Sequence, residues 1–212
     1  MWNEQIIMML LEGIKDTLYM TLTSTLIGYV IGLPMGILLT VTDKDGIHPN
    51  TAVYKVLDVI ANLIRSVPFL ILLIVLIPFT RFLIGRSYGP TATIVPLVIA
   101  AAPYIARMVE SSLKEVDAGV IEAARSMGAS NFTIVTKVML VEARTSLIVG
   151  ATISLGTILG YSAMAGTVGG GGLGDIAIRY GYTRWQTDIM IVTVVLQVVL
   201  FQIFQTIGMK TA

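Results

Sequence analysis

Long apolar stretches separated by short polar segments run along most of this chain. Five of them are each close to the roughly 20 apolar residues that cross the hydrocarbon core of a bilayer. The pattern predicts an all-α, polytopic membrane protein with five transmembrane helices. Since no internal repeat or linker interrupts the pattern, we expect residues 1–212 to form a single membrane domain. The predicted helices cover residues 18–41, 56–79, 91–109, 146–165 and 189–208.

Composition narrows the function classes. Hydrophobic residues make up 55% of the chain and charged residues only 13%, whereas soluble domains carry roughly 25% charge. The formal net charge of +1 disfavours nucleic-acid binding. The absence of cysteine excludes disulfides and thiol catalysis. A single histidine, His48, makes a metal site improbable, and we expect no catalytic residues and no cofactor on this chain.

Lysines and arginines gather in and beside the segment 110–145, between the third and fourth predicted helices. Cytoplasmic loops of membrane proteins carry an excess of these residues. We therefore expect this segment to lie in the cytoplasm, which places the N-terminus outside and the C-terminus inside when five helices cross the membrane. Arg107 and Glu110, at the end of the third helix, are expected to extend their side chains to the water interface.

The segment 110–145 is predicted to contain two short helices. Asp117 can cap the first helix, and Gly128 can end it in the left-handed conformation. Ser130 can cap the second. Small side chains at Ala123 and Ala124 allow close approach of another protein, and Glu122 offers it a carboxylate. From these residues alone, the segment is either a docking element or a helix lying on the membrane surface.

Polar residues inside apolar stretches are candidates for a transport path, because an unpaired charge in hydrocarbon is costly. Arg65 precedes Pro68, which frees the carbonyl of Ile64 from its helical hydrogen bond. Arg65 can donate to that carbonyl, pair with Asp58, or face a substrate carboxylate.

A second polar group interrupts the fourth helix. Tyr161, Ser162 and Met164 can line a narrow gate for an amino acid with a thioether side chain. They can equally serve helix packing, with Ser162 allowing close approach and Met164 filling a gap.

The run Glu122-Ala123-Ala124, followed by Gly128, resembles the EAA loop of ABC importer membrane subunits. Other segments resemble the membrane subunit of bacterial methionine ABC importers. The resemblance departs at Val141 and Thr145, where members of that family often have proline. The other matching segments are 65–69, 102–107, 160–166 and the glycine-rich 169–174.

The resemblance implies an inner-membrane permease subunit for methionine that works as a homodimer. Its partners would be two cytosolic ATPase subunits and an extracytoplasmic substrate-binding protein or lipoprotein. Glu122, Ala123, Ala124 and Gly128 would then couple this chain to the ATPase. The expected translocation-path residues are Tyr161, Ser162, Met164 and Arg65.

ATP and Mg²⁺ are expected on the partner, because the chain lacks the Gly-x-x-x-x-Gly-Lys-Ser/Thr phosphate loop. Residues 169–174 satisfy Gly-x-Gly-x-x-Gly, but no strand is predicted before them, so we expect a tight turn or close backbone packing there. Two alternatives remain open. One is an importer for another amino acid or small solute, and the other is an autonomous ion-driven transporter.

Overall fold

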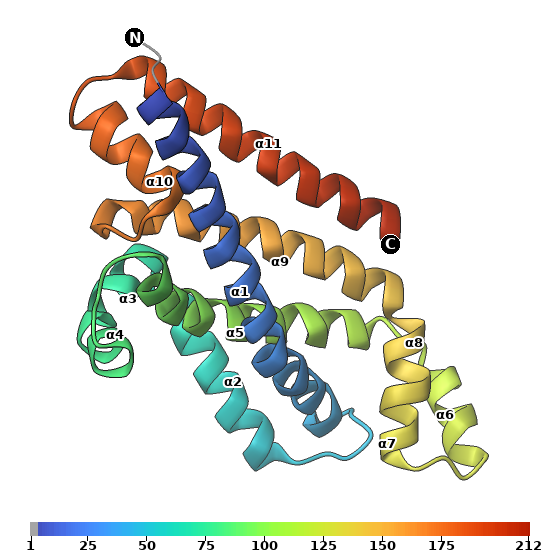
Figure 1. The fold of residues 1–212 in the computed structure, drawn as a ribbon. Coiled ribbons are helices and arrows are strands. Elements are labelled where there is room, and N and C mark those ends of the chain that lie inside the picture. The colour runs from blue at the N-terminus through green and yellow to red at the C-terminus, as the bar shows by residue number, and fades with distance from the viewer. Residues whose placement is uncertain (1–3) are drawn as a thin grey trace.

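The computed structural model describes residues 4–212, and every regular element in that range is a helix (Figure 1). The all-α prediction is therefore confirmed. The elements are α1 Glu4–Thr42, α2 Thr51–Ser66, α3 Phe69–Val75, α4 Ile77–Ile84, α5 Pro90–Lys114, α6 Ala118–Ser126, α7 Asn131–Thr133, the π-helical η1 Ile134–Met139, α8 Leu140–Glu142, α9 Arg144–Ala165, the 3₁₀ turn η2 Gly166–Val168, α10 Gly172–Ile176, the π-helical η3 Ala177–Tyr182, and α11 Thr187–Thr211.

Four helices in the described range are long and apolar enough to cross a membrane, namely α1, α5, α9 with η2, and α11. The bent pair α2 and α3 brings the number to five if it counts as one span. The predicted stretches 91–109, 146–165 and 189–208 correspond to α5, α9 and α11, each of which is slightly longer than predicted.

The prediction of one continuous helix over residues 56–79 is wrong. The helix α2 ends at Ser66, and α3 leaves at an angle of 101° to it. Val67 between them is extended, with φ −86° and ψ 126°. The physical reason is Pro68, whose ring disfavours the helical conformation of the residue before it and supplies no backbone N–H.

Helix α1 includes Glu4, the first residue that the structure describes, well ahead of the predicted start at residue 18. Leu10, Gly13 and Thr17 are buried at helical spacing in this additional part. The hydroxyl oxygen of Thr17 accepts a hydrogen bond of 2.9 Å from the amide of Leu173 in α10. Packing against α10 therefore extends the helix through a segment that carries several charged residues.

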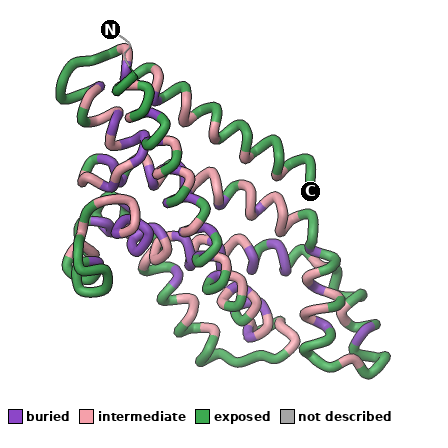
Figure 2. The backbone as a smooth tube through the Cα atoms, in the orientation of Figure 1, coloured by how far each residue is buried: buried purple, intermediate pink, exposed green. Residues whose placement is uncertain are grey.

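The core lies where α1 crosses α5, and α11 lies at the periphery (Figure 2). In the apolar part of α5, 61% of the residues are buried, whereas in the apolar part of α11 only 11% are. The glycines Gly28, Gly32 and Gly36 of α1 face α5. A Cβ atom at Gly32 would lie 2.6 Å from the carbonyl oxygen of Ala102. The two backbones thus approach as closely as small-residue stripes in membrane helices allow.

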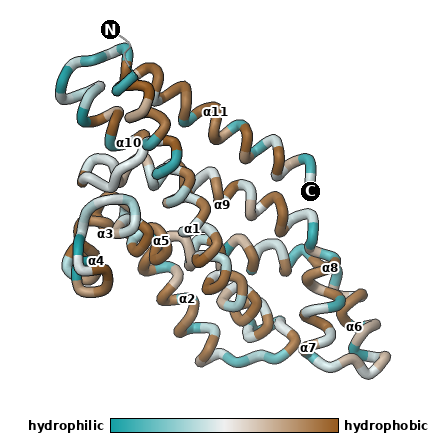
Figure 3. Tube along the Cα trace, viewed as in Figure 1, coloured by the Kyte–Doolittle hydropathy of each residue, from teal (hydrophilic) through white to brown (hydrophobic). Residues whose placement is uncertain are grey.

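Much of α11 is hydrophobic (Figure 3), and many of its apolar side chains are exposed. Among them are Ile191, Val195 and Val199. A face of this kind suits hydrocarbon or another apolar helix rather than water, which agrees with α11 as a membrane helix.

Candidate functional site

Residues 115–143, between α5 and α9, form a helix–turn–helix loop that we call the interhelical loop. It is shorter at both ends than the predicted segment 110–145, because α5 continues to Lys114 and α9 begins at Arg144. Figure 1 shows this loop at one end of the molecule, beyond the long helices. The loop is therefore placed to contact a protein outside the apolar part of the structure.

The predicted helix ends in this loop are confirmed. The carboxylate of Asp117 accepts a hydrogen bond of 2.7 Å from the amide of Gly119. Gly128 has φ +81°. Its amide donates to the carbonyl of Arg125 at 2.9 Å, and the next amide, of Ala129, donates to the carbonyl of Ala124 at 3.1 Å. This pair of bonds is the Schellman motif, which satisfies the last carbonyls of a helix.

The second helix of the loop starts as predicted at Ser130. Its hydroxyl accepts a hydrogen bond of 3.2 Å from the amide of Thr133. The residues that depart from the family pattern lie within helices further on. Val141 lies in α8, and the hydroxyl of Thr145 in α9 donates to the carbonyl of Ala212 at 3.2 Å. The C-terminus therefore lies beside the end of the interhelical loop.

The three residues of the Glu-Ala-Ala run have different surroundings. Glu122 and Ala123 are exposed, whereas Ala124 is only 5% exposed. Ala124 belongs to a hydrophobic cluster that also contains Ile134 and Met139 of the second helix. The small side chain of Ala124 therefore serves packing inside the loop, while Glu122 and Ala123 remain available to a partner.

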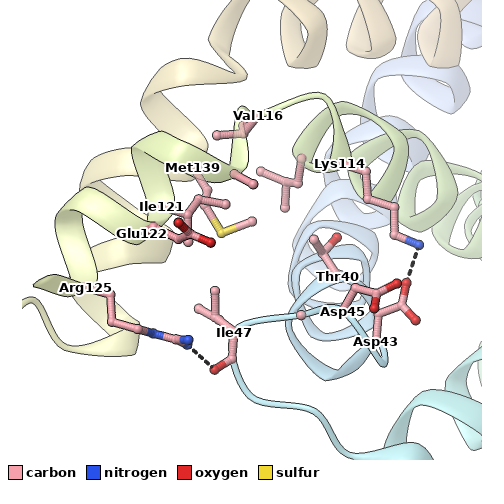
Figure 4. Close-up of a pocket in the computed structure, with 13 residues that line it drawn as sticks. Thr40, Asp43, Asp45, Ile47, Lys114, Val116, Ile121, Glu122, Arg125 and Met139 are labelled. Carbon is pink, nitrogen blue, oxygen red and sulfur yellow. Dashed lines mark hydrogen bonds and ion pairs between the residues drawn. The ribbon is translucent and has the colours of Figure 1, made fainter.

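A cleft of about 520 Å³ lies between the interhelical loop, the end of α5 and the connection from α1 to α2 (Figure 4). Glu122 and Arg125 line the side formed by α6, and Asp43 and Lys114 lie on the opposite side. The guanidinium of Arg125 donates to the carbonyl of Ile47 at 2.7 Å. This bond joins the two walls, so both contribute to the same surface.

A network of charged residues lies next to this cleft. The Lys114 ammonium contacts the carboxylates of Asp43 at 2.7 Å and Glu110 at 2.8 Å. The Arg107 guanidinium contacts Glu110 at 2.6 Å and also pairs with Asp58 of α2. The ammonium of Lys114 holds the pKa of the Asp43 carboxyl below its usual value. The network ties α5 to α2 and to the segment after α1.

The predicted extension to the water interface is wrong for Glu110, whereas Arg107 is half-buried. Glu110 is only 5% exposed and pairs with two cations. Sequence reasoning missed the network because its remaining carboxylates, Asp43 and Asp58, come from other segments. The available signal was the spacing of residues 107, 110 and 114, which places alternating charges on one face of a helix.

Arg65 makes neither of the two contacts within the chain that were predicted as alternatives for it. Asp58 pairs with Arg107, and the carbonyl of Ile64 accepts a hydrogen bond of 3.3 Å from the amide of Val67. Arg65 itself is exposed, and its side chain has no hydrogen bond or ion pair with any residue in the described range 4–212. Its guanidinium is therefore free to meet a group that is not part of this chain.

Arg65 and Tyr161 line the same cavity, of about 190 Å³. The other two candidates in the fourth helix do not line it. The Ser162 hydroxyl is buried and donates to the carbonyl of Leu159 at 2.7 Å, and the Met164 side chain is 49% exposed. The structure thus brings together two of the four predicted path residues. Tyr104, which we did not predict, is a further polar group on the same cavity.

The glycine-rich segment 169–174 makes close backbone contacts, as predicted. The carbonyl of Gly169 accepts a hydrogen bond of 2.9 Å from the amide of Gly89, and the amide of Gly170 donates to the carbonyl of Ala165 at 3.0 Å. These bonds connect the end of α9 to the start of α5.

Apolar helices long enough to span a membrane, with a capped helix–turn–helix loop at one end, are the architecture of a polytopic membrane protein. The family model described as "Binding-protein-dependent transport system inner membrane component" matches residues 16–208. The chain therefore belongs to this family, which confirms the resemblance inferred from the sequence and the inner-membrane location.

Curated relatives within this family include methionine transport permeases. The probable D-methionine transport system permease protein MetI of Vibrio cholerae is 48% identical over 200 residues, covering 94% of this chain and 89% of the relative. The D-methionine transport system permease protein MetI of Escherichia coli K12 is 50% identical over 164 residues, covering 77% of this chain and 76% of the relative.

Solved structures agree with these relatives. A chain from the inward-facing MetNI methionine ABC transporter superposes with a TM-score of 0.97 at 47% identity, covering 99% of this chain and 97% of that chain. A chain from an amino acid ABC transporter crystallised with histidines has a TM-score of 0.79 at 22% identity, covering 96% of this chain and 92% of that chain. The second likeness concerns the fold alone.

Proposed function

We propose that this chain is the permease subunit of an ATP-driven importer and forms the path by which methionine crosses the inner membrane. The observation that carries the proposal is the likeness to the MetNI chain, which extends over 99% of this chain at 47% identity. Relatives named as D-methionine permeases support the same substrate. We further propose that residues 1–212 act as one membrane domain.

The proposed partners are a second copy of this chain, two cytosolic ATPase subunits that bind ATP and Mg²⁺, and an extracytoplasmic substrate-binding protein. A homodimer is the simplest way to surround a polar substrate with so few helices. The interhelical loop would dock on an ATPase subunit through Glu122, Ala123, Ala124 and Gly128. Exposure of Glu122 and Ala123 at one end of the molecule supports this role.

In the proposed mechanism, closure of the ATPase subunits moves the docked loops, and the dimer alternates between inward-open and outward-open states. Arg65, Tyr161, Ser162 and Met164 are the proposed path residues. The shared cavity of Arg65 and Tyr161 supports the first two.

We propose that the N-terminus lies outside and the C-terminus inside. The positive charge in and beside the interhelical loop supports a cytoplasmic position for it. The hydrogen bond between Thr145 and Ala212 puts the C-terminus at the same end of the molecule as the loop. Labelling of a tag at each end in intact cells and in inverted vesicles tests this orientation.

Purification in mild detergent followed by mass spectrometry tests the class of transporter. A phosphate-loop ATPase should come with the chain in stoichiometric amount. If the intact chain reproducibly purifies alone and transports its substrate without ATP, the ion-driven alternative replaces the proposal. Uptake of labelled methionine then tests the substrate. Failure of excess unlabelled methionine to block uptake would favour another amino acid or small solute.

A further inference from the structure

The break between α2 and α3 creates a small cavity with one charged side chain in its wall. This cavity, of about 190 Å³, is lined by polar groups from three helices, namely Arg65 of α2, Tyr104 of α5 and Tyr161 of α9. The rest of its lining is apolar and consists of Ile64, Val67, Phe69, Leu72 and Ala100. Three segments that are far apart in the sequence therefore form one cavity, which is apolar except for three polar side chains.

The guanidinium of Arg65 has no anion of its own. The nearest carboxylate along α2, that of Asp58, is held by Arg107, and the carbonyl freed by Pro68 is taken by the amide of Val67. No residue within 4–212 forms a hydrogen bond or ion pair with the Arg65 side chain. A guanidinium among membrane helices requires a counter-charge, so this position favours an anionic group from outside the chain.

The shape and chemistry of the cavity indicate which anion. A guanidinium presents parallel N–H donors that match the two oxygens of a carboxylate. The rings of Phe69 and Tyr161, both of which line the cavity, stack with centroids 4.4 Å apart and an interplanar angle of 5°, so part of the cavity wall is aromatic. Aromatic walls of this kind contact thioether and other apolar side chains favourably.

We propose that Arg65 binds the α-carboxylate of the transported amino acid, with the stacked rings of Phe69 and Tyr161 against its side chain. This assignment rests on the proposed function, since it takes the cavity to lie on the transport path. It makes Arg65 the residue that selects for a free carboxylate. An amino acid amide, which has the same side chain and no negative charge, should not bind there.

The chain contains no cysteine, so a single introduced thiol reports on the cavity directly. Ala100 lines the cavity. We would introduce Ala100→Cys into the assembled importer in membrane vesicles. The measurement is the rate at which the new thiol on this chain reacts with a small thiol reagent. L-Methionine should slow the reaction, whereas methioninamide should not. Gln205→Cys, in a separate pocket between α9 and α11, should react at the same rate with and without methionine.

The second variant tests Arg65 itself. Combining Ala100→Cys with Arg65→Gln should raise the methionine concentration for half-protection by about tenfold or more, as expected for loss of a charge-assisted bond. Arg65→Lys keeps the charge but loses the bidentate geometry and should have a smaller effect. Arg81→Gln, a matched change of an exposed arginine on α4, should leave protection unchanged.

Methionine uptake by the Ala100→Cys importer, measured in parallel, distinguishes failure of the carboxylate site at Arg65 from failure of the proposed function. Uptake with no protection by methionine, or with protection that Arg65→Gln leaves intact, overturns the carboxylate site and leaves the proposed function standing. An assembled importer that hydrolyses ATP but takes up another solute instead of methionine overturns the proposed function.

Discussion

Substitution of Gly128 tests the geometry of the interhelical loop most directly. The residue has φ +81°, and a Cβ atom built on it would meet nothing within 4 Å. Its replacement therefore creates no clash with a neighbour, and the cost arises from the backbone alone. For an L-residue the left-handed conformation costs roughly 1–2 kcal/mol, which corresponds to a change of about 5–30-fold in an equilibrium. Asparagine tolerates this conformation best, and a β-branched residue least.

We expect the amount of methionine transported per ATP hydrolysed to fall least in Gly128→Asn, more in Gly128→Ala and most in Gly128→Val. The assay is methionine uptake and ATP hydrolysis by the same importer in proteoliposomes, and all three variants should still reach the membrane. Gly85 at the end of α4 is the matched control, because it also has φ +81° and open space around it. Gly85→Val should have the same free-energy cost from its backbone conformation, but it should not change the amount of methionine transported per ATP hydrolysed. Wild-type coupling in Gly128→Val would refute the reasoning.

Three further changes probe the loop and the charged network beside it. Glu122→Lys should leave the chain in the membrane but reduce recovery of the ATPase during purification, whereas recovery at the wild-type level would argue against docking through this carboxylate. Arg107→Gln leaves the partly exposed Asp58 without its cation and should destabilise the chain by about 1–3 kcal/mol, measured as a lower midpoint of thermal unfolding in detergent. A much smaller effect would show that solvent compensates the network. Asp43→Asn should lower the same midpoint at neutral pH, because Lys114 depresses the pKa of Asp43. That contribution is present above the usual pKa of aspartate, roughly 3.9, and is lost as the pH falls through the lower pKa of the folded state, so the two proteins should converge in acid.

Local chemistry explains what the sequence predicted correctly. Asp117, Gly128 and Ser130 fix helix ends through hydrogen bonds or backbone angles within a few residues, so their roles follow from short-range rules. The long apolar helices are predictable for a similar reason, since length and hydropathy suffice.

Features that depend on distant segments were not predictable in the same way. Pro68 indicated a break in the second apolar stretch, but the angle of 101° was not predictable from it, since α3 also packs on α5 and α9. The early part of α1 is helical because α10 covers it. Glu110 can be buried, and Arg107 half-buried, because Lys114 and Asp58 supply the opposite charges. The cavity of Arg65 likewise needed α5 and α9 to complete it.

The glycine face of α1 has a consequence for how such a subunit can move. Carbonyl groups and side chains of α5 occupy the space that side chains at Gly32 and Gly36 would fill, so separating the two helices would open a void along their whole crossing. The pair is thus expected to behave as one stiff body during transport. Rearrangement then falls to elements joined less tightly, which are the angular junction before α3 and the sparsely covered α11. If α1 and α5 move as one rigid body, a displacement at one end of the pair produces a displacement at its other end, on the opposite side of the membrane.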